Sequence, residues 1–178
     1  NYVTLGKTGL KAAVVSFGGI PIQRADGANT KAVVDKLEEY GINYIDTARG
    51  YTVSEEYLGT ALEGRRDKFI LATKSMSRDA ASMAADVETS LRNLRTGYID
   101  LYQLHNLPEK DSEKVFGPGG AYEALTAARE DGKIGHIGGT AHSADALKIL
   151  VEDYADRIET VMFPYNIVED QRRDVLAL

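Results

Sequence analysis

The 178-residue sequence contains no cysteine. The chain therefore cannot form disulfides, hold zinc through thiolates or attack a substrate through sulfur. Positive charge is also scarce, because 21 Lys and Arg stand against 27 Asp and Glu and give a formal net charge of −6. Since nucleic acids bind clustered Lys and Arg, this balance argues against a nucleic-acid-binding protein.

Long hydrophobic runs are lacking too. No apolar stretch approaches the roughly 20 residues that cross a bilayer, and the opening stretch NYVTLGKTGLKAAVV has no apolar run of signal-peptide type. We therefore expect no membrane contact and a cytoplasmic protein. Hydrophobic residues make up 43% of the sequence, which is ordinary for a globular chain with a buried core. No linker or low-complexity tract is present, so residues 1–178 are predicted to form a single domain.

Six short apolar runs, most of them rich in β-branched or aromatic residues, alternate with longer amphipathic segments. The runs predict buried strands at residues 14–18, 42–46, 69–74, 99–104, 134–139 and 160–163. The amphipathic segments predict helices at residues 30–40, 54–63, 79–95, 122–131 and 144–154, with another from about residue 170. Ser54 is expected to cap the second helix. The Thr8-Gly9 turn within residues 2–13 predicts a small β-hairpin before the first strand.

Strict alternation of strand and helix indicates parallel strands joined by crossover helices. Two α/β architectures fit this order: an open doubly wound sheet and an eight-stranded (β/α)8 TIM barrel. An open dinucleotide-binding sheet carries G-x-G-x-x-G after its first strand, whereas this sequence has Gly18-Gly19-Ile20-Pro21 there. Since Pro21 also disfavours a helix starting at once, we predict the barrel, incomplete, with about six of its eight βα units.

Four ionisable residues follow successive predicted strands. Asp46 closes the second strand, Tyr51 lies in the loop behind it, Lys74 closes the third strand and His105 follows the fourth. Each alone has an ordinary structural explanation, such as a turn cap, a solvated side chain or a packed histidine. Because barrel enzymes carry their chemistry at the C-terminal ends of the strands, we expect the four side chains to gather on one rim.

Such a set suits the reduction of a carbonyl group by hydride. The developing alkoxide needs a proton, and a tyrosine hydroxyl with a pKa of about 10 is a weak acid. An ammonium beside it favours the tyrosinate, so Lys74 is expected to lower the pKa of Tyr51. Asp46 would keep Lys74 charged, and a neutral His105 would orient the carbonyl.

The sequence resembles the aldo-keto reductase family along nearly its whole length. The matching segments are LGKTGL from Leu5, FGG from Phe17, GINYIDTARGY from Gly41, SE and LGTAL from Ser54 and Leu58, FILATK from Phe69, SLRNLRTGYIDLYQLH from Ser90 and EDGKIGHIG from Glu130. The resemblance implies a barrel enzyme that reduces an aldehyde or ketone with NADPH, NADH being possible. It also implies that Tyr51 is the general acid, that Asp46 and Lys74 tune it, and that His105 orients the substrate.

The same resemblance implies a cofactor site. The residues expected near the cofactor are Gly19, Ile20, Asp46, Thr140, His142 and Met162. The substrate is expected to meet the loop of residues 106–120, beginning with Asn106.

Two positions depart from the family's pattern. The family usually holds the nicotinamide carboxamide with Ser-Asn after the fifth strand, where this chain has Thr140 and His142. Its sixth strand usually offers a Gln, where this chain has Met162, and a thioether is a weak acceptor and no donor. We expect altered nicotinamide anchoring beside an intact catalytic set.

Two other functions remain open. A strand-end lysine in a barrel can be a nucleophile, so Lys74 could serve a Schiff-base aldolase. Alternatively, the open sheet edges of an incomplete barrel could make the chain a structural or binding module. These 178 residues alone are then expected to bind dinucleotide weakly and to turn over slowly. No metal site is expected, because His105, His136 and His142 lack H-E-x-x-H spacing. Neither the carbonyl substrate nor the oligomeric state follows from the sequence.

Overall fold

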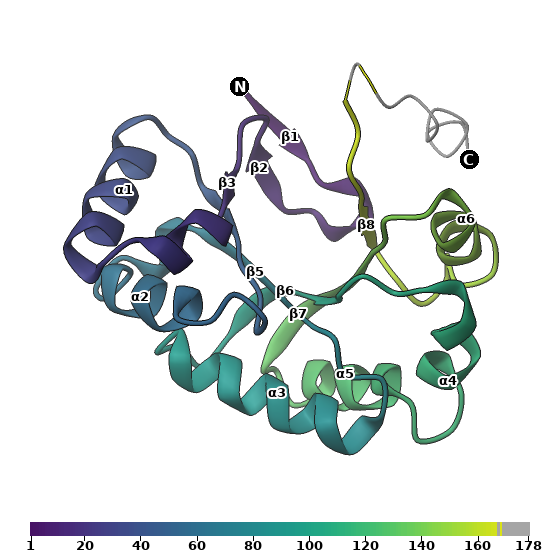
Figure 1. Ribbon diagram of the computed structural model, residues 1–178. Coiled ribbons are helices and arrows are strands. Elements are labelled where there is room, and N and C mark those ends of the chain that lie inside the picture. Colours follow the sequence, from purple (N-terminus) through teal and green to yellow (C-terminus); the bar gives the residue numbers. More distant parts are fainter. Residues whose placement is uncertain (167, 169–178) are drawn as a thin grey trace.

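The computed structural model describes residues 1–166 and residue 168. Its centre is a parallel sheet of six strands in the order β3-β4-β5-β6-β7-β8. The strands are β3 (Phe17–Gly18), β4 (Tyr44–Asp46), β5 (Ile70–Ser75), β6 (Ile99–Leu104), β7 (Ile134–Thr140) and β8 (Thr160–Met162). Consecutive strands in the chain are neighbours in the sheet, and the sheet curls as part of a barrel wall (Figure 1). The predicted incomplete (β/α)8 barrel is therefore confirmed.

Helices connect the strands and cover the outer, convex side of the sheet, as Figure 1 shows. They are α1 (Gly27–Glu39), α2 (Ser54–Ala61), α3 (Ala80–Asn93), α4 (Ser112–Phe116), α5 (Ala121–Glu130) and α6 (Ala144–Glu152), with the 3-10 turns Ile20–Arg24, Arg66–Lys68 and Glu109–Asp111. Three begin at a side-chain cap that the sequence dictates: Asp26 accepts from Asn29 N, Asp79 from Ser82 N and Ser143 from Ala146 N.

The alternation of side chains along each strand divides the core into two parts. On the outer face, Ile45, Leu71, Tyr102 and Ile137 are buried in the large cluster that also holds the apolar faces of the helices. On the inner face, Tyr44, Ile70, Ala72 and Leu101 form a smaller cluster with Ala12. Neighbouring residues of one strand therefore point to opposite faces of the sheet. On β5, Lys74 lies on the inner face and Thr73 on the outer face.

A hairpin closes the N-terminal end of the inner face. Strands β1 (Tyr2–Thr4) and β2 (Lys11–Ala13) pair antiparallel, and Gly9 has the positive φ of 74° that the turn requires. Leu5 and Leu10 pack against the inner cluster. Asn43, which precedes β4, accepts from Ala13 N at 2.9 Å and donates to Lys11 O at 2.9 Å. The predicted hairpin is confirmed and forms the floor beneath the inner face of the sheet.

Three local predictions were wrong. The first strand does not start at Val14, because Val14 and Val15 are 58% and 62% exposed and only Phe17–Gly18 pair with β4. Ser54 does not cap α2: its hydroxyl is buried and donates to Gly19 O at 2.9 Å, and the cap position is Val53. The segment after β6 holds α4, which no periodicity had indicated.

The helix predicted from about residue 170 lies outside the described residues. In the described part of the chain, no helix combines the length and the apolar character that a membrane crossing requires.

Candidate active site

Asp46 and Lys74 form a buried ion pair at the C-terminal end of the inner face. The Lys74 ammonium donates to Asp46 Oδ2 and also to the Thr47 carbonyl at 2.7 Å. Lys74 is only 3% exposed. Burial lowers the pKa of Lys74 and raises the pKa of Asp46, and the attraction within the pair opposes both shifts. The lysine nitrogen is therefore held in place by two acceptors at the C-terminal end of β5.

The loop after β4 brings Tyr51 above this pair. It runs beside β5, with Thr47 N donating to Ala72 O at 2.8 Å and Arg49 N to Lys74 O at 3.0 Å. It then turns back through Thr52, whose φ of 43° is unusual for a residue with a side chain. As a result, the Lys74 ammonium lies 5.0 Å from the centroid of the Tyr51 ring.

His105 stands beside the tyrosine. The two rings meet edge to face, with centroids 5.9 Å apart and planes at 86°. Burial, together with the charges of Lys74, Arg78 and His142, lowers the pKa of His105 to about 4. The imidazole is therefore neutral at physiological pH, and it can hydrogen-bond a substrate oxygen without carrying charge. Asp46, Tyr51, Lys74 and His105 thus come together on one rim, from three neighbouring strands.

The pKa of Tyr51 departs from the expectation. Burial and, secondarily, the negative charge of Asp46 raise it above the ordinary value. The expected lowering of the Tyr51 pKa by Lys74 was wrong in direction, because burial and the nearby Asp46 charge both favour the neutral phenol. Within residues 1–166, no hydrogen bond joins the Tyr51 hydroxyl to Lys74. The phenol is therefore firmly protonated in the resting site.

The turn after β6 presents Asn106 beside His105. Asn106 has a φ of 47°, in the left-handed region that asparagine tolerates better than most residues. Its backbone N donates to the Thr140 hydroxyl at 2.8 Å, and Arg78 Nη2 donates to the carbonyls of His105 and Asn106, both at 2.9 Å. Asn106 and His142 line one side cleft of about 300 Å³. Asn106, Thr140 and His142 are thus brought together next to His105.

Gly19 lies where β3 meets β4. Its N–H donates to Asp46 O at 2.6 Å. A Cβ at this position would stand 3.0 Å from both Asp46 O and the Ser54 hydroxyl, so glycine permits the close approach. Ile20 follows with its side chain 54% exposed. The first loop therefore packs tightly under Asp46 while Ile20 faces outward.

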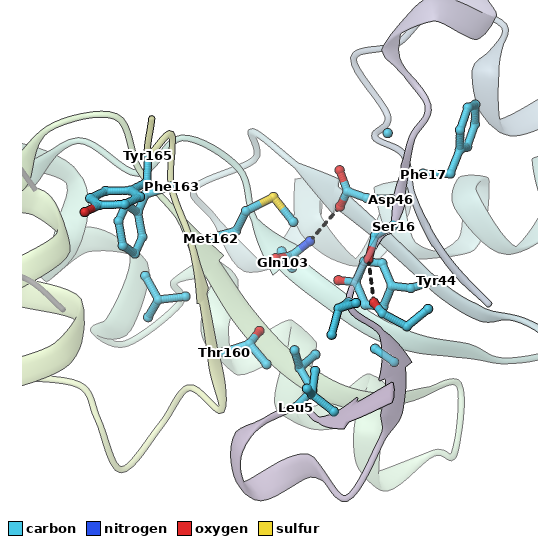
Figure 2. A pocket seen from close by; sticks show the side chains of 16 residues that line it. Leu5, Ser16, Phe17, Tyr44, Asp46, Gln103, Thr160, Met162, Phe163 and Tyr165 are labelled. Carbon is cyan, nitrogen blue, oxygen red and sulfur yellow. Dashed lines mark hydrogen bonds between the residues drawn. The ribbon is translucent and has the colours of Figure 1, made fainter. Parts of the chain in front are cut away.

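The inner face opens into a cavity of about 540 Å³. Asp46, Gln103, Thr160 and Met162 share its wall, and Figure 2 shows Met162 extending from β8 toward Gln103 and Asp46. Gln103 Nε2 donates to Asp46 Oδ1 at 3.1 Å. Met162 therefore lines the same cavity as Asp46.

Three residues that contact the site residues or the loops that carry them were not expected from the sequence. Gln103 contacts Asp46, Arg78 holds the His105–Asn106 turn, and Glu55 bonds both Arg49 and Thr73. For Gln103 a signal was available, because it is the next-to-last residue of the predicted strand that leads to His105, and barrel sites gather at the C-terminal ends of strands. Arg78 and Glu55 act through the tertiary fold, which spacing does not reveal. In the residues described, no group of three or more His, Asp and Glu side chains is placed to hold a metal ion.

Comparisons with known proteins identify the family of this chain. The family model described as "Aldo/keto reductase family" matches residues 15–178. The chain is 28% identical to "uncharacterized oxidoreductase YqkF" of Bacillus subtilis, over 98% of this chain and 59% of that protein. It is 30% identical to "aldo-keto reductase YhdN" of the same organism, over 97% of this chain and 56% of that protein. The chain thus spans somewhat over half the length of these relatives.

A solved structure matches the fold over nearly the whole chain. The holo form of aldo-keto reductase AKR11C1 from Bacillus halodurans superposes with a TM-score of 0.83 at 29% identity, covering 98% of this chain and 60% of that one. Its apo form gives a TM-score of 0.75 at the same identity.

Proposed function

Because the chain belongs to the aldo/keto reductase family, we propose that it reduces an aldehyde or ketone with hydride from a nicotinamide dinucleotide, Tyr51 giving the proton. The observation that carries this proposal is the cluster on the rim. A buried Asp46–Lys74 pair lies under the Tyr51 ring, and a neutral His105 lies at the edge of that ring. This set supplies a proton donor, a fixed positive charge and a neutral hydrogen-bonding group at one point.

Tyr51 is the proton donor in this proposal. Its raised pKa keeps the hydroxyl protonated before the reaction. Once the proton leaves for the developing alkoxide, the phenolate has the Lys74 ammonium at 5.0 Å from its ring centroid. That attraction acts on the charge that forms during the reaction and is felt little by the neutral ring. The lysine thus assists the transfer without acidifying the resting phenol.

His105 orients the carbonyl in the same proposal. With a pKa near 4 it carries no charge at neutral pH. A neutral imidazole on this rim can therefore hold a substrate oxygen in line with the Tyr51 hydroxyl.

The residues around the rim fit the nicotinamide end of a dinucleotide. When bound, a reduced nicotinamide supplies the hydride. The Thr140 hydroxyl already accepts from Asn106 N and keeps its own proton, which it can donate to a carboxamide oxygen. Met162 offers an apolar surface on the neighbouring strand, and Asn106 and His142 border the side cleft. We assign Gly19 and Ile20 to the edge of the same site, NADPH as cofactor with NADH as the alternative, and a small carbonyl compound as substrate.

A Schiff-base aldolase is less compatible with this site. Imine formation needs the lone pair of a neutral lysine amine, whereas Lys74 is 3% exposed and donates to both Asp46 and Thr47. We therefore propose the reductase and keep the aldolase as an outcome of the test. The non-catalytic module is likewise an outcome, since a binding role alone does not require the paired charges under Tyr51.

The test monitors NADPH absorbance with a panel of small aldehydes and ketones, and borohydride trapping on the same panel. The reductase predicts carbonyl-dependent NADPH oxidation and no covalent adduct on Lys74. Trapped substrate on Lys74 without NADPH oxidation would establish the aldolase instead. Cofactor binding with neither reaction would support the binding module.

A further inference from the structure

Gln103 connects the inner face of the sheet to the Asp46 carboxylate. It lies on β6 in register with Lys74 on β5, and its side chain is almost entirely buried. Its Nε2 donates to Asp46 Oδ1 at 3.1 Å, while Lys74 donates to Oδ2. Each oxygen of the carboxylate therefore has its own donor, one neutral and one charged. Figure 2 shows the Gln103–Asp46 hydrogen bond at the wall of the cavity.

We propose that Gln103 is a positioning residue for the reduction: it fixes the Asp46 carboxylate in the orientation in which Lys74 is held beneath Tyr51. The inference rests on the proposed function of the site. Gln103 acts through Asp46, and it touches neither Tyr51 nor the place of the substrate in this account.

The orientation of the amide supports this role. An ionised carboxylate only accepts hydrogen bonds, so the amide nitrogen of Gln103 has to face Asp46. Its Oε1 is then buried with no partner in the part of the chain that the structure describes. A buried amide oxygen without a partner costs stability. A glutamine used only to fill space would be replaced by Met or Leu without that cost, so the contact with Asp46 explains the residue.

The strand next to β6 leaves room for this side chain. Gly138 on β7 is in register with Gln103. A Cβ on Gly138 would lie 3.2 Å from Gln103 Cγ and 2.3 Å from the Thr160 hydroxyl oxygen. Glycine at this position therefore keeps Gln103 free to reach across the face of the sheet toward β4.

Loss of the amide would change the charge state of the pair. The charged and titratable groups facing Asp46 are Lys74 on β5, Tyr51 in the following loop and Tyr44 on the same strand. Lys74 and Gln103 both stabilise the ionised form of Asp46, Lys74 through its charge and Gln103 through a neutral hydrogen bond. Burial acts in the opposite direction and favours the protonated form. Without Gln103, protonation of Asp46 becomes easier, and a protonated Asp46 no longer balances the lysine charge.

The experiment titrates the Asp46 carboxyl by ¹³C NMR in aspartate-labelled protein, with the resonance assigned by its loss in Asp46→Asn. The variant is Gln103→Met, which keeps the length and removes the donor. The matched control is Thr160→Val, which removes a polar atom from the same cavity wall without touching Asp46. We expect the midpoint to move to higher pH by about one unit in Gln103→Met, the scale of one hydrogen bond to a charged group. Thr160→Val should leave the midpoint in place.

An unchanged midpoint in Gln103→Met would overturn the inference. If that variant does not fold, Gln103→Glu serves instead. Two adjacent carboxyls share a proton, so the titration midpoint of Asp46 must then rise. An Asp46 midpoint that does not rise would also contradict the inference. The titration needs neither cofactor nor turnover, so its failure leaves the proposed reductase standing. Conversely, wild-type protein that oxidises no NADPH would contradict the proposed function and leave the titration result intact.

Discussion

The two faces of strand β5 carry two buried ionic clusters that differ in the surroundings of their carboxylates. On the outer face, the Glu55 carboxylate is 1% exposed and accepts from Arg49, Thr73, Ser90 and Asn93 at 2.7 to 3.3 Å. These donors come from the loop after β4, from β5 and from α3, so the cluster ties three elements together. Its carboxylate has a donor for each of its lone-pair directions.

The inner cluster has different surroundings. Asp46 and Lys74 pair with each other, yet Gln103 Oε1 and His105 Nδ1 are buried without partners among the described residues. The inner cluster also borders a cavity of about 540 Å³. Because ligand sites are usually concave, the cavity that Asp46 and Gln103 line is consistent with a binding role for the inner cluster. Burial of charge and unpaired polar atoms occur in both clusters, since Arg49 Nε is also buried without a hydrogen-bond partner among the described residues. The cavity beside Asp46 is what distinguishes the inner cluster.

The largest expected effect comes from breaking the inner cluster with Lys74→Met. Loss of the charge beneath Tyr51 should slow hydride transfer by roughly a thousandfold, the scale of assisted proton transfer. It also leaves Asp46 buried without its partner, which should cost roughly 3 kcal/mol of unfolding free energy. Single-turnover NADPH oxidation and urea unfolding measure the two effects. Lys31→Met, at an exposed surface pair, is the control and should change neither.

The outer cluster should respond in stability alone. Glu55→Gln keeps the size of the side chain and removes the charge that Arg49 faces, so we expect a loss of about 2–3 kcal/mol in unfolding free energy. Because neither the tyrosine nor the lysine is altered, the rate of hydride transfer per folded molecule should change less than about threefold, well below the catalytic losses typical of proton-transfer residues. Glu56→Gln, on the exposed side of the same helix, is the matched control. If fully folded Glu55→Gln protein transferred hydride a hundredfold more slowly, the claim that the outer cluster serves stability alone would be wrong.

His105 makes stability depend on pH. Its pKa is about 4 in the folded chain, against an ordinary value of 6.5. Between these values the unfolded chain binds a proton that the folded chain excludes, so stability should fall as pH decreases from 6.5 toward 4. Above pH 6.5, His105 should not make the unfolding free energy depend on pH. Urea unfolding at a series of pH values should show a shallower acid decline in His105→Gln, and parallel curves would contradict the neutral imidazole.

The smallest effect concerns the nicotinamide. Met162→Gln replaces a thioether on the cavity wall with an amide that can both donate and accept. We expect roughly five- to tenfold tighter NADPH binding, the gain of about one hydrogen bond. A fluorescence titration of the cofactor measures it. Weaker binding in the variant would show that the carboxamide lies elsewhere.

Much of this fold could be predicted from the sequence because its strands are buried on both sides. The run at residues 99–104 became β6 with the same bounds, since helices cover one face and the inner face is enclosed. At β3 the apolar pattern misled, because Val14 and Val15 face solvent. Apolar character therefore gave the bounds of β6 correctly and misplaced the start of β3.

The site was less predictable than the fold. The strand ends placed Asp46, Lys74 and His105 on one rim, because parallel strands end at one edge. The direction of the Tyr51 pKa shift could not be read from spacing, since it depends on how deeply the fold buries the phenol and on how close Asp46 comes to it. Ser54 matched the pattern of a cap, yet its hydroxyl bonds Thr47 and Gly19 from distant loops. Such tertiary hydrogen bonds leave no periodic trace in the sequence.

The most direct test of the account is the single-turnover rate of NADPH oxidation in Tyr51→Phe at saturating cofactor, with Tyr57→Phe on α2 as the matched control. Removal of the proton donor should lower the rate by roughly a hundred- to ten-thousandfold while NADPH affinity stays unchanged. Tyr57→Phe should behave as the wild type. A Tyr51→Phe protein that transfers hydride at the wild-type rate would contradict the proposed role of the inner cluster.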